Sequence, residues 1–192
     1  MPAATDSAGA QPLRLFFALP CPAALGAEIC AWRDRLSLAG RPVPAANLHI
    51  TLAFLGAQPA QRLPQLLALG EAIRGEAFCL RLGRLGELGE GFTCLFPSPC
   101  PPALEALATR LREGLEALGL AIETRPFVPH LTLLRHSRAS PSPPARCFAW
   151  EVQRFGLYLS CNAAEGVHYR ELGSWPLANR HADLLPGAGA SN

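Results

Sequence analysis

The chain has 192 residues, of which 49% are hydrophobic, 17% charged and 7% aromatic, a composition that excludes a disordered or fibrous protein. A domain of this length buries roughly 70% of the surface of its unfolded chain, so its core needs neither disulfides nor a structural metal. The net charge of +2 is too small for a protein that coats nucleic acid through a broad basic face.

Apolar periodicity predicts strands and helices that alternate along the body of the chain. The three helices have apolar residues three and four positions apart and are followed by Gly40, Gly75 and Gly119. Pro22 opens the first helix, and Ser98 is expected to cap the third. In chain order we expect a strand over 14–20, a helix from Pro22, a strand over 47–56, a helix over 60–74, strands over 78–88 and 93–99, a helix after Ser98, a strand over 127–136, a Pro/Ser-rich loop over 137–146, and strands over 147–160 and 167–177.

This order of elements mixes strands and helices in both halves of the chain. The mixture favours an α+β domain with two similar lobes over a doubly wound parallel sheet. We expect a single domain over 13–178, with flexible tails over 1–12 and 179–192.

Cysteine usage and hydropathy indicate the cellular compartment. Seven cysteines, an odd number with no C-x-x-C spacing, argue against a disulfide framework and against a zinc knuckle. The longest apolar runs are too short to cross a bilayer, and the first residues lack the basic and apolar segments of a signal peptide. We therefore expect a cytoplasmic protein with no membrane partner. We also expect a monomer with no obligate protein partner.

A four-residue pattern occurs twice, as His49-Ile50-Thr51-Leu52 and, 81 residues later, as His130-Leu131-Thr132-Leu133. Chance alone predicts about 0.16 His-x-Thr triplets in a chain of this composition. Because side chains alternate along a strand, each copy places an imidazole and a hydroxyl on one face and its apolar residues on the other. A half-buried structural histidine is the ordinary interpretation of one copy, but the pair predicts a shared site.

Two chemistries could use such a pair. A metal site is disfavoured, because no acidic or thiol side chain lies within four residues of either histidine, and no metal or other cofactor is expected. In-line displacement at phosphorus needs a base on one side and an acid on the other, and imidazole can fill either role near neutral pH.

The remaining side chains of this predicted site would bind the phosphate. The hydroxyls of Thr51 and Thr132 can hydrogen-bond its non-bridging oxygens. All 17 basic residues are arginine, so no lysine ammonium is available, and contacts to the phosphate must come from a guanidinium, the backbone or a hydroxyl. Arg135 is the obvious candidate, although strand alternation places it on the opposite face from Thr132 unless the strand bulges.

These motifs resemble those of the 2H phosphoesterases, and within them the bacterial RNA 2′,3′-cyclic phosphodiesterases, also called 2′-5′ RNA ligases. The likeness covers nearly all of 13–178 and includes RLFFALP at the start and Y-x-x-L-x-x-W-P-L from Tyr169 to Leu177. It implies a bilobal α+β fold with helices outside and a central cleft. It also implies metal-free hydrolysis of a terminal 2′,3′-cyclic phosphate to a 2′-phosphate, with possible reverse ligation.

The resemblance further implies a role for each side chain. His49 would protonate the departing O3′ and His130 would activate water, while Phe54 and Tyr169 would bind the nucleobase. Two other functions stay open: an esterase of the same superfamily that acts on small cyclic nucleotides or 2′-5′ oligonucleotides, and a nucleotide- or RNA-binding module without turnover. The expected ligands are RNA ends or small cyclic-phosphate nucleotides.

Overall fold

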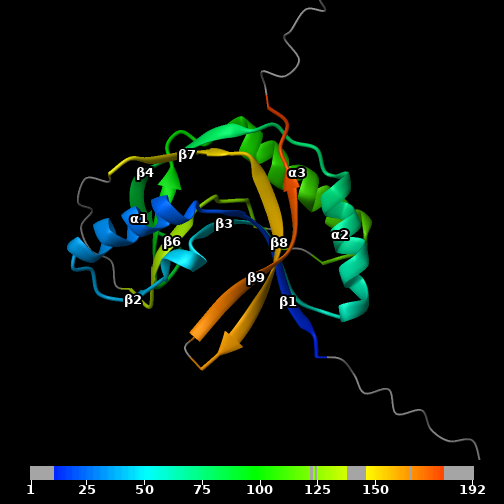
Figure 1. The fold of residues 1–192 in the computed structure, drawn as a ribbon, viewed down its shortest axis with the longest axis horizontal. Coiled ribbons are helices and arrows are strands. Elements are labelled where there is room, and N and C mark those ends of the chain that lie inside the picture. Colours follow the sequence, from blue (N-terminus) through cyan, green and yellow to red (C-terminus); the bar gives the residue numbers. More distant parts are fainter. Residues whose placement is uncertain (1–10, 122, 124, 138–145, 165, 180–192) are drawn as a thin grey trace, which may run out of the picture.

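A computed structural model describes residues 11–121, 123, 125–137, 146–164 and 166–179. The tails expected over 1–12 and 179–192 lie almost wholly outside these residues, as does most of the loop expected over 137–146. The described chain folds into three α-helices, two short 3-10 helices and one large sheet (Figure 1). The elements are β1 (Leu13–Pro20), α1 (Ala23–Arg35), β2 (Arg41–Pro42), η1 (Ala45–Asn47), β3 (His49–Gln58), η2 (Ala60–Arg62), α2 (Leu63–Ala72), β4 (Phe78–Glu87), β5 (Phe92–Pro97), α3 (Pro102–Ala117), β6 (Leu131–Arg135), β7 (Phe148–Val152), β8 (Arg154–Ala163) and β9 (Gly166–Pro176).

The sheet consists of two halves that meet at its centre. Its strand order is β7-β4-β5-β6-β3-β1-β8-β9, and the short strand β2 also pairs with β6. Every pair of neighbouring strands is antiparallel. The junction between β6 and β3 divides the eight strands of this path into two groups of four, which are the two lobes, and β2 is a ninth strand beside β6. The α+β class and the two antiparallel lobes expected from the sequence are confirmed.

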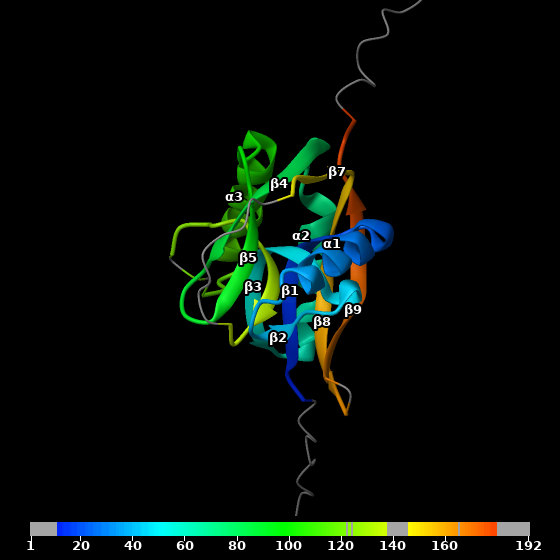
Figure 2. The ribbon, with the colours of Figure 1, turned by 90° about the vertical axis from the view of Figure 1, so that its left-hand side faces the viewer.

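One face of the sheet is covered by the helices and carries the main hydrophobic core. Helix α3 buries Leu104, Leu107 and Leu111 at helical spacing, as the sequence predicts. Helices α2 and α3 contact each other and lie beside β3, β8 and β9 of one lobe (Figures 1 and 2). Helix α1 lies beside the other lobe, where its Trp32 packs edge-on against Phe148 of β7. The helices therefore divide between the two lobes.

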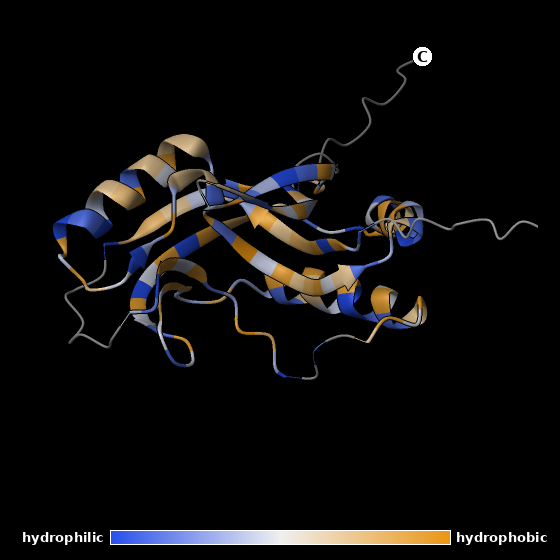
Figure 3. Ribbon diagram, turned by 90° about the horizontal axis from the view of Figure 1, so that it is seen from below, coloured by the Kyte–Doolittle hydropathy of each residue, from blue (hydrophilic) through white to orange (hydrophobic). Residues whose placement is uncertain are grey.

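The other face of the sheet carries the second, smaller apolar cluster. It contains Phe16, Ala18 and Tyr158, with Tyr169 packed against it. Strand β1 is buried on both of its faces, which explains its uninterrupted apolar sequence, whereas polar and apolar residues alternate along other strands (Figure 3).

Close approach of α2 to β9 depends on a glycine. A Cβ at Gly70 would lie 2.3 Å from the Trp175 ring, so no larger residue fits between the helix and that indole. Trp175 in turn contacts Phe17 and Phe155, at centroid distances of 6.0 and 5.3 Å. The helix therefore seals the core at the β8–β9 end of the sheet.

Two expected strands differ from the structure. The strand expected over 147–160 is two strands, β7 and β8, separated at Gln153 and paired with different partners. The strand expected over 127–136 begins only at Leu131, because Pro126 and Pro129 lack the N–H groups that a sheet requires.

The expected cap of α3 is also wrong. Pro101, rather than Ser98, occupies the N-cap, and Pro102 is the first helical residue. A residue that precedes proline is disfavoured in the helical region, so Pro99, Pro101 and Pro102 delay the start of the helix.

Of the helices that the structure describes, none combines the length and apolar character that a bilayer-spanning segment needs.

Candidate active site

Both motif histidines are held by the same local hydrogen bond. Nδ1 of His49 donates to the carbonyl oxygen of Asn47, and Nδ1 of His130 donates to that of Val128, each at 2.7 Å and each two residues upstream. A carbonyl oxygen only accepts, so the proton lies on Nδ1 in both rings. Nε2 of each ring is therefore available to exchange a proton with a ligand.

The two motifs lie next to each other across the centre of the sheet. Ile50 of β3 pairs with Leu131 of β6, and these residues occupy the same position in the two motifs. Extending this antiparallel register by one residue places His49 opposite Thr132, and Thr51 opposite His130. Diagonal neighbours in such a pair lie about 7 to 8 Å apart. The register therefore puts the two histidines on one face of the sheet, diagonally across the junction of the two lobes.

Bulges at equivalent positions bring two further side chains to this face. Leu52 is skipped in the pairing of β3 with β1, and Leu133 is skipped in the pairing of β6 with β5. An extra residue reverses the alternation of side chains along a strand. Phe54 and Arg135, each five residues after a motif histidine, are thereby turned to the face that carries the histidines. Arg135 could share a face with Thr132 only if the strand bulges between them, and the bulge at Leu133 meets that condition.

A cavity of about 310 Å³ opens beside His49. It is lined by residues from both lobes: Arg14, Phe16, His49, Thr51, Phe54, Arg135, Ser160, Asn162, Val167 and Tyr169. His130 and Thr132 lie on the same face but are not among the lining residues, so the cavity extends over the His49 side of the junction. Phe54 is 51% exposed, and its ring lies 5.9 Å from the guanidinium carbon of Arg14.

Tyr169 connects three parts of this cavity. Its ring lies edge-on to His49, at 5.1 Å and 85°, and edge-on to Phe16, at 4.9 Å and 75°. Its hydroxyl accepts a hydrogen bond from Nη2 of Arg135 at 3.2 Å. Tyr169 therefore fixes the positions of the imidazole and the guanidinium relative to each other.

The environment of His49 keeps its ring neutral near pH 7. Burial lowers the pKa of His49 to about 4, with smaller contributions in the same direction from Arg135 and His130, while the hydrogen bond to Asn47 opposes them. In the neutral ring, Nε2 accepts a hydrogen bond from the hydroxyl of Thr51 at 3.1 Å. The positive charges of Arg135 and His130 lower the pKa of His49, whereas a bound anion in the cavity would raise it.

The second threonine has a different partner. The thiol of Cys94 donates to Oγ1 of Thr132 over 3.8 Å, and burial raises the pKa of that thiol to about 11. The thiol therefore stays uncharged and does not repel a bound phosphate. Because its oxygen accepts from Cys94, the Thr132 hydroxyl keeps its own proton for another acceptor.

Several side chains at this site were not singled out by the sequence. Asn47 links the first motif to the β8–β9 hairpin through a hydrogen bond from Nδ2 to the carbonyl oxygen of Val167, at 2.6 Å. Cys94, Arg14 and Ser160 come from strands whose pairing the sequence does not specify. For Arg14, the buried neighbour Leu15 would have indicated the face, but not which strand lies beside the motifs. Cys94 lies in a run of buried residues, so alternation gives no signal for it.

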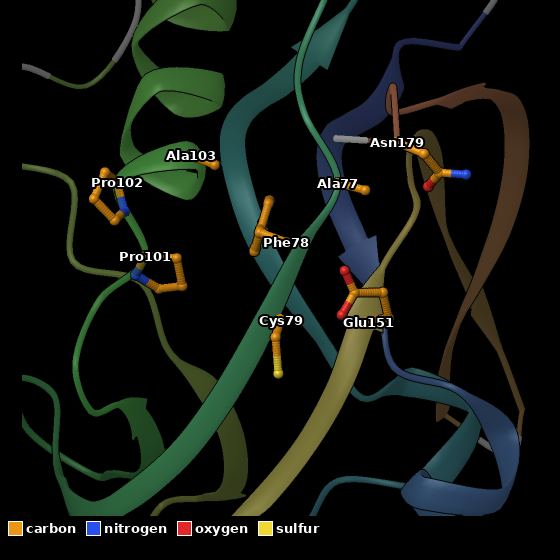
Figure 4. A pocket seen from close by; sticks show the side chains of 8 residues that line it. All are labelled: Ala77, Phe78, Cys79, Pro101, Pro102, Ala103, Glu151 and Asn179. Carbon is orange, nitrogen blue, oxygen red and sulfur yellow. The ribbon is translucent and has the colours of Figure 1, made fainter. Parts of the chain in front are cut away.

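A larger cavity, of about 520 Å³, lies elsewhere. Pro101, Pro102 and Ala103 at the start of α3 line one side of it, and Cys79 and Glu151 lie on neighbouring strands β4 and β7 (Figure 4). None of its eight lining residues is a histidine or an arginine. Its size therefore does not make it a better candidate for acid–base chemistry than the cavity beside His49.

Comparison with known proteins identifies the family. The chain is 38% identical over 172 residues to the RNA 2′,3′-cyclic phosphodiesterase of Escherichia coli K12, covering 87% of this chain and 98% of that protein. It is 34% identical to the enzyme of the same name from Thermus thermophilus, covering 88% and 92%. The crystal structure of E. coli LigT in its apo form matches with a TM-score of 0.80 and 38% identity, over 88% of this chain and 99% of that one.

E. coli LigT has also been solved in complex with 3′-AMP, and that structure matches with a TM-score of 0.81 and 38% identity, over 86% of this chain and 98% of that one. The fold is therefore the α+β fold expected from the motifs. Residues 21–165 match the model of the 2′-5′ RNA ligase superfamily. The chain therefore belongs to that superfamily.

Proposed function

We propose that this protein hydrolyses RNA 2′,3′-cyclic phosphate ends to 2′-phosphates, using His49 and His130 as a paired acid and base and no metal ion. The observation that carries the proposal is the diagonal placement of two imidazoles across the Ile50–Leu131 pair, each with Nδ1 tied to a carbonyl oxygen. The names of the relatives support the choice of substrate.

The reaction breaks one bond to phosphorus and forms another. The oxygen of water attacks phosphorus while its proton passes to Nε2 of His130. The P–O3′ bond breaks opposite to the attack, and O3′ receives the proton from Nε2 of His49. The product carries a 2′-phosphate and a free 3′-hydroxyl, and the histidines return to their starting states by exchanging protons with solvent.

The acid role requires His49 to gain a proton when substrate binds. The free ring is neutral near pH 7 because its pKa is about 4. A cyclic phosphate diester carries one negative charge, and such a charge beside the ring favours the imidazolium. Substrate binding and protonation of His49 are therefore coupled.

Arg135 and the two threonines bind the phosphate in this proposal, and Phe54 stacks on the terminal base. Guanidinium and hydroxyl donors stabilise the charge that develops on the non-bridging oxygens. Phe54 is exposed at the rim of the cavity, where a base can reach its ring without displacing core residues. Both histidines belong to one chain, so the proposed site needs no second copy, and we propose a monomer without an obligate protein partner. We propose that it acts in the cytoplasm.

The test uses a short RNA with a 2′,3′-cyclic phosphate end and an excess of EDTA. We expect a single product that co-migrates with the 2′-phosphate standard and not with the 3′-phosphate standard. Faster hydrolysis of a free cyclic mononucleotide than of the RNA end would favour the small-nucleotide alternative. No turnover of either substrate, or a 3′-phosphate product, would contradict the proposal.

A further inference from the structure

A row of three side chains crosses the lobe that contains His130. Leu95 of β5 pairs with Leu131 of β6, so Phe96 lies opposite His130, and the two rings are 6.4 Å apart. Arg84 of β4 pairs with Phe96, and its guanidinium carbon lies 4.1 Å from the centre of that ring. The row therefore extends from His130 to Arg84 over two strand spacings, about 10 Å.

The guanidinium of Arg84 lies over the Phe96 ring, and the Arg84 side chain is exposed to solvent. Phe96 is only 3% exposed, with the Arg84 guanidinium over its ring, whereas Arg84 itself is exposed. A Cβ at Gly86 would lie 3.3 Å from both Nη1 of Arg84 and Cε2 of Phe96, so glycine leaves room for this stack. Contact with an aromatic face positions a guanidinium without neutralising its charge.

Arg84 makes no ion pair within the part of the chain that the structure describes. Arg154 provides the contrast, because the carboxylate of Glu171 lies 2.6 Å from its Nη1. An exposed, oriented guanidinium without a carboxylate partner is suited to a phosphate oxygen or to stacking on a base.

We propose that Arg84, supported by Phe96, binds a second nucleotide whose 5′-hydroxyl occupies the position of the attacking water at His130. The inference rests on the proposed function and extends it to a 2′-5′-linked dinucleotide. In-line attack requires the incoming oxygen and O3′ to lie on opposite sides of phosphorus. In the proposed function the nucleotide that carries O3′ occupies the cavity beside His49, so the incoming nucleotide lies on the His130 side, where Arg84 and Phe96 are found.

The chemistry balances without another reactant. In the ligation direction, O5′ bonds to phosphorus, its proton passes to His130, the P–O3′ bond breaks, and O3′ takes the proton of His49. The product is a 2′-5′ phosphodiester. In the reverse direction, O3′ attacks, O5′ leaves with a proton from His130, and a 2′,3′-cyclic phosphate re-forms.

The test compares two substrates of one Arg84→Ala variant. Cleavage of 2′-5′-linked ApA gives adenosine 2′,3′-cyclic phosphate and adenosine, and needs the second subsite. Hydrolysis of adenosine 2′,3′-cyclic phosphate itself does not. We expect kcat/KM for the dinucleotide to fall about tenfold or more, which is about 1.4 kcal/mol of binding, while kcat/KM for the cyclic nucleotide stays within about twofold.

Two matched variants complete the experiment. Arg81→Ala removes another exposed arginine of β4, and should leave both reactions unchanged. Arg84→Lys keeps the charge but not the planar group, so it should restore only part of the dinucleotide cleavage.

Three results would overturn the inference: an equal loss on both substrates, unimpaired dinucleotide cleavage by Arg84→Ala, or a wild-type protein that hydrolyses the cyclic nucleotide but never cleaves the dinucleotide. Failure of the proposed function is distinct, because the wild-type protein would then leave the cyclic phosphate of an RNA end intact.

Discussion

Nη2 of Arg135 donates a hydrogen bond to the hydroxyl of Tyr169, and this bond connects the two lobes at the candidate active site. Arg135 lies on β6, whereas Tyr169 lies on β9 at the far end of the other half of the sheet. The ring of Tyr169 also contacts His49 edge-on. This geometry adds a positioning role to the nucleobase contact expected of Tyr169.

Removal of that hydroxyl should weaken phosphate binding. We expect Tyr169→Phe to lower kcat/KM for a cyclic nucleotide about tenfold, mainly through KM, because Arg135 loses its orienting partner. In an Arg135→Ala background the same change should cost little, since the two residues act through one contact. Steady-state kinetics of the single and double variants measure this coupling. Fully additive losses would show that Tyr169 does not act through Arg135.

The low pKa of His49 predicts a pH-dependent stability. The pKa of this group is about 4 in the folded protein and 6.5 for an ordinary histidine, so the unfolded chain binds more protons between these values. The free energy of unfolding should therefore fall as the pH is lowered from 6.5 to 4, by up to about 3 kcal/mol from this group.

Urea denaturation of the wild-type protein and of His49→Gln at several pH values measures this contribution. The variant has no titratable group at this position and should lose less stability over the same interval. Parallel curves for the two proteins would mean that His49 is not buried in its neutral form.

The acid and base can be assigned with an activated leaving group. A p-nitrophenolate leaves without a proton, so a nucleoside p-nitrophenyl phosphodiester needs no general acid. We expect His49→Ala to recover most of the wild-type rate on this substrate, whereas His130→Ala remains slow. Absorbance of released p-nitrophenolate gives both rates. Rescue of His130→Ala instead would exchange the two roles.

Base stacking on Phe54 predicts a loss that depends on the base. We expect Phe54→Ala to raise KM for adenosine 2′,3′-cyclic phosphate about tenfold or more, because stacking contributes about 1 to 3 kcal/mol per base. An abasic ribose 2′,3′-cyclic phosphate serves as the control, and its KM should not change. An equal loss on both substrates would place the effect of Phe54 on the phosphate site instead.

The sequence was sufficient to predict the class of the fold and the alternation of side chains within the two motifs. Alternation of His49 and Thr51 with buried Ile50 and Leu52 follows from the period of a strand, and the structure has it. The pattern also contained an unused signal that marks the break between β7 and β8. The residues that face the main core stand at even positions in β7 (Phe148, Val152) and at odd positions in β8 (Phe155, Leu157, Leu159).

The geometry around the motifs depends on pairings between distant strands. The bulges at Leu52 and Leu133 are defined only by the partners β1 and β5, so alternation alone could not place Phe54 or Arg135. The approach of Cys94 to Thr132 has the same origin. A local pattern predicts which residues share a strand face, whereas the register between strands decides which faces meet.

The central claim is that His49 and His130 act together on one phosphorus atom. The most direct test is the rate of hydrolysis of an RNA 2′,3′-cyclic phosphate end by His49→Ala, His130→Ala and the double variant, with circular dichroism to confirm that each is folded. Each single change should slow the reaction by about 10²-fold or more, and the double change should add little, because the two groups serve one step. A folded single variant that keeps nearly the wild-type rate would contradict the claim.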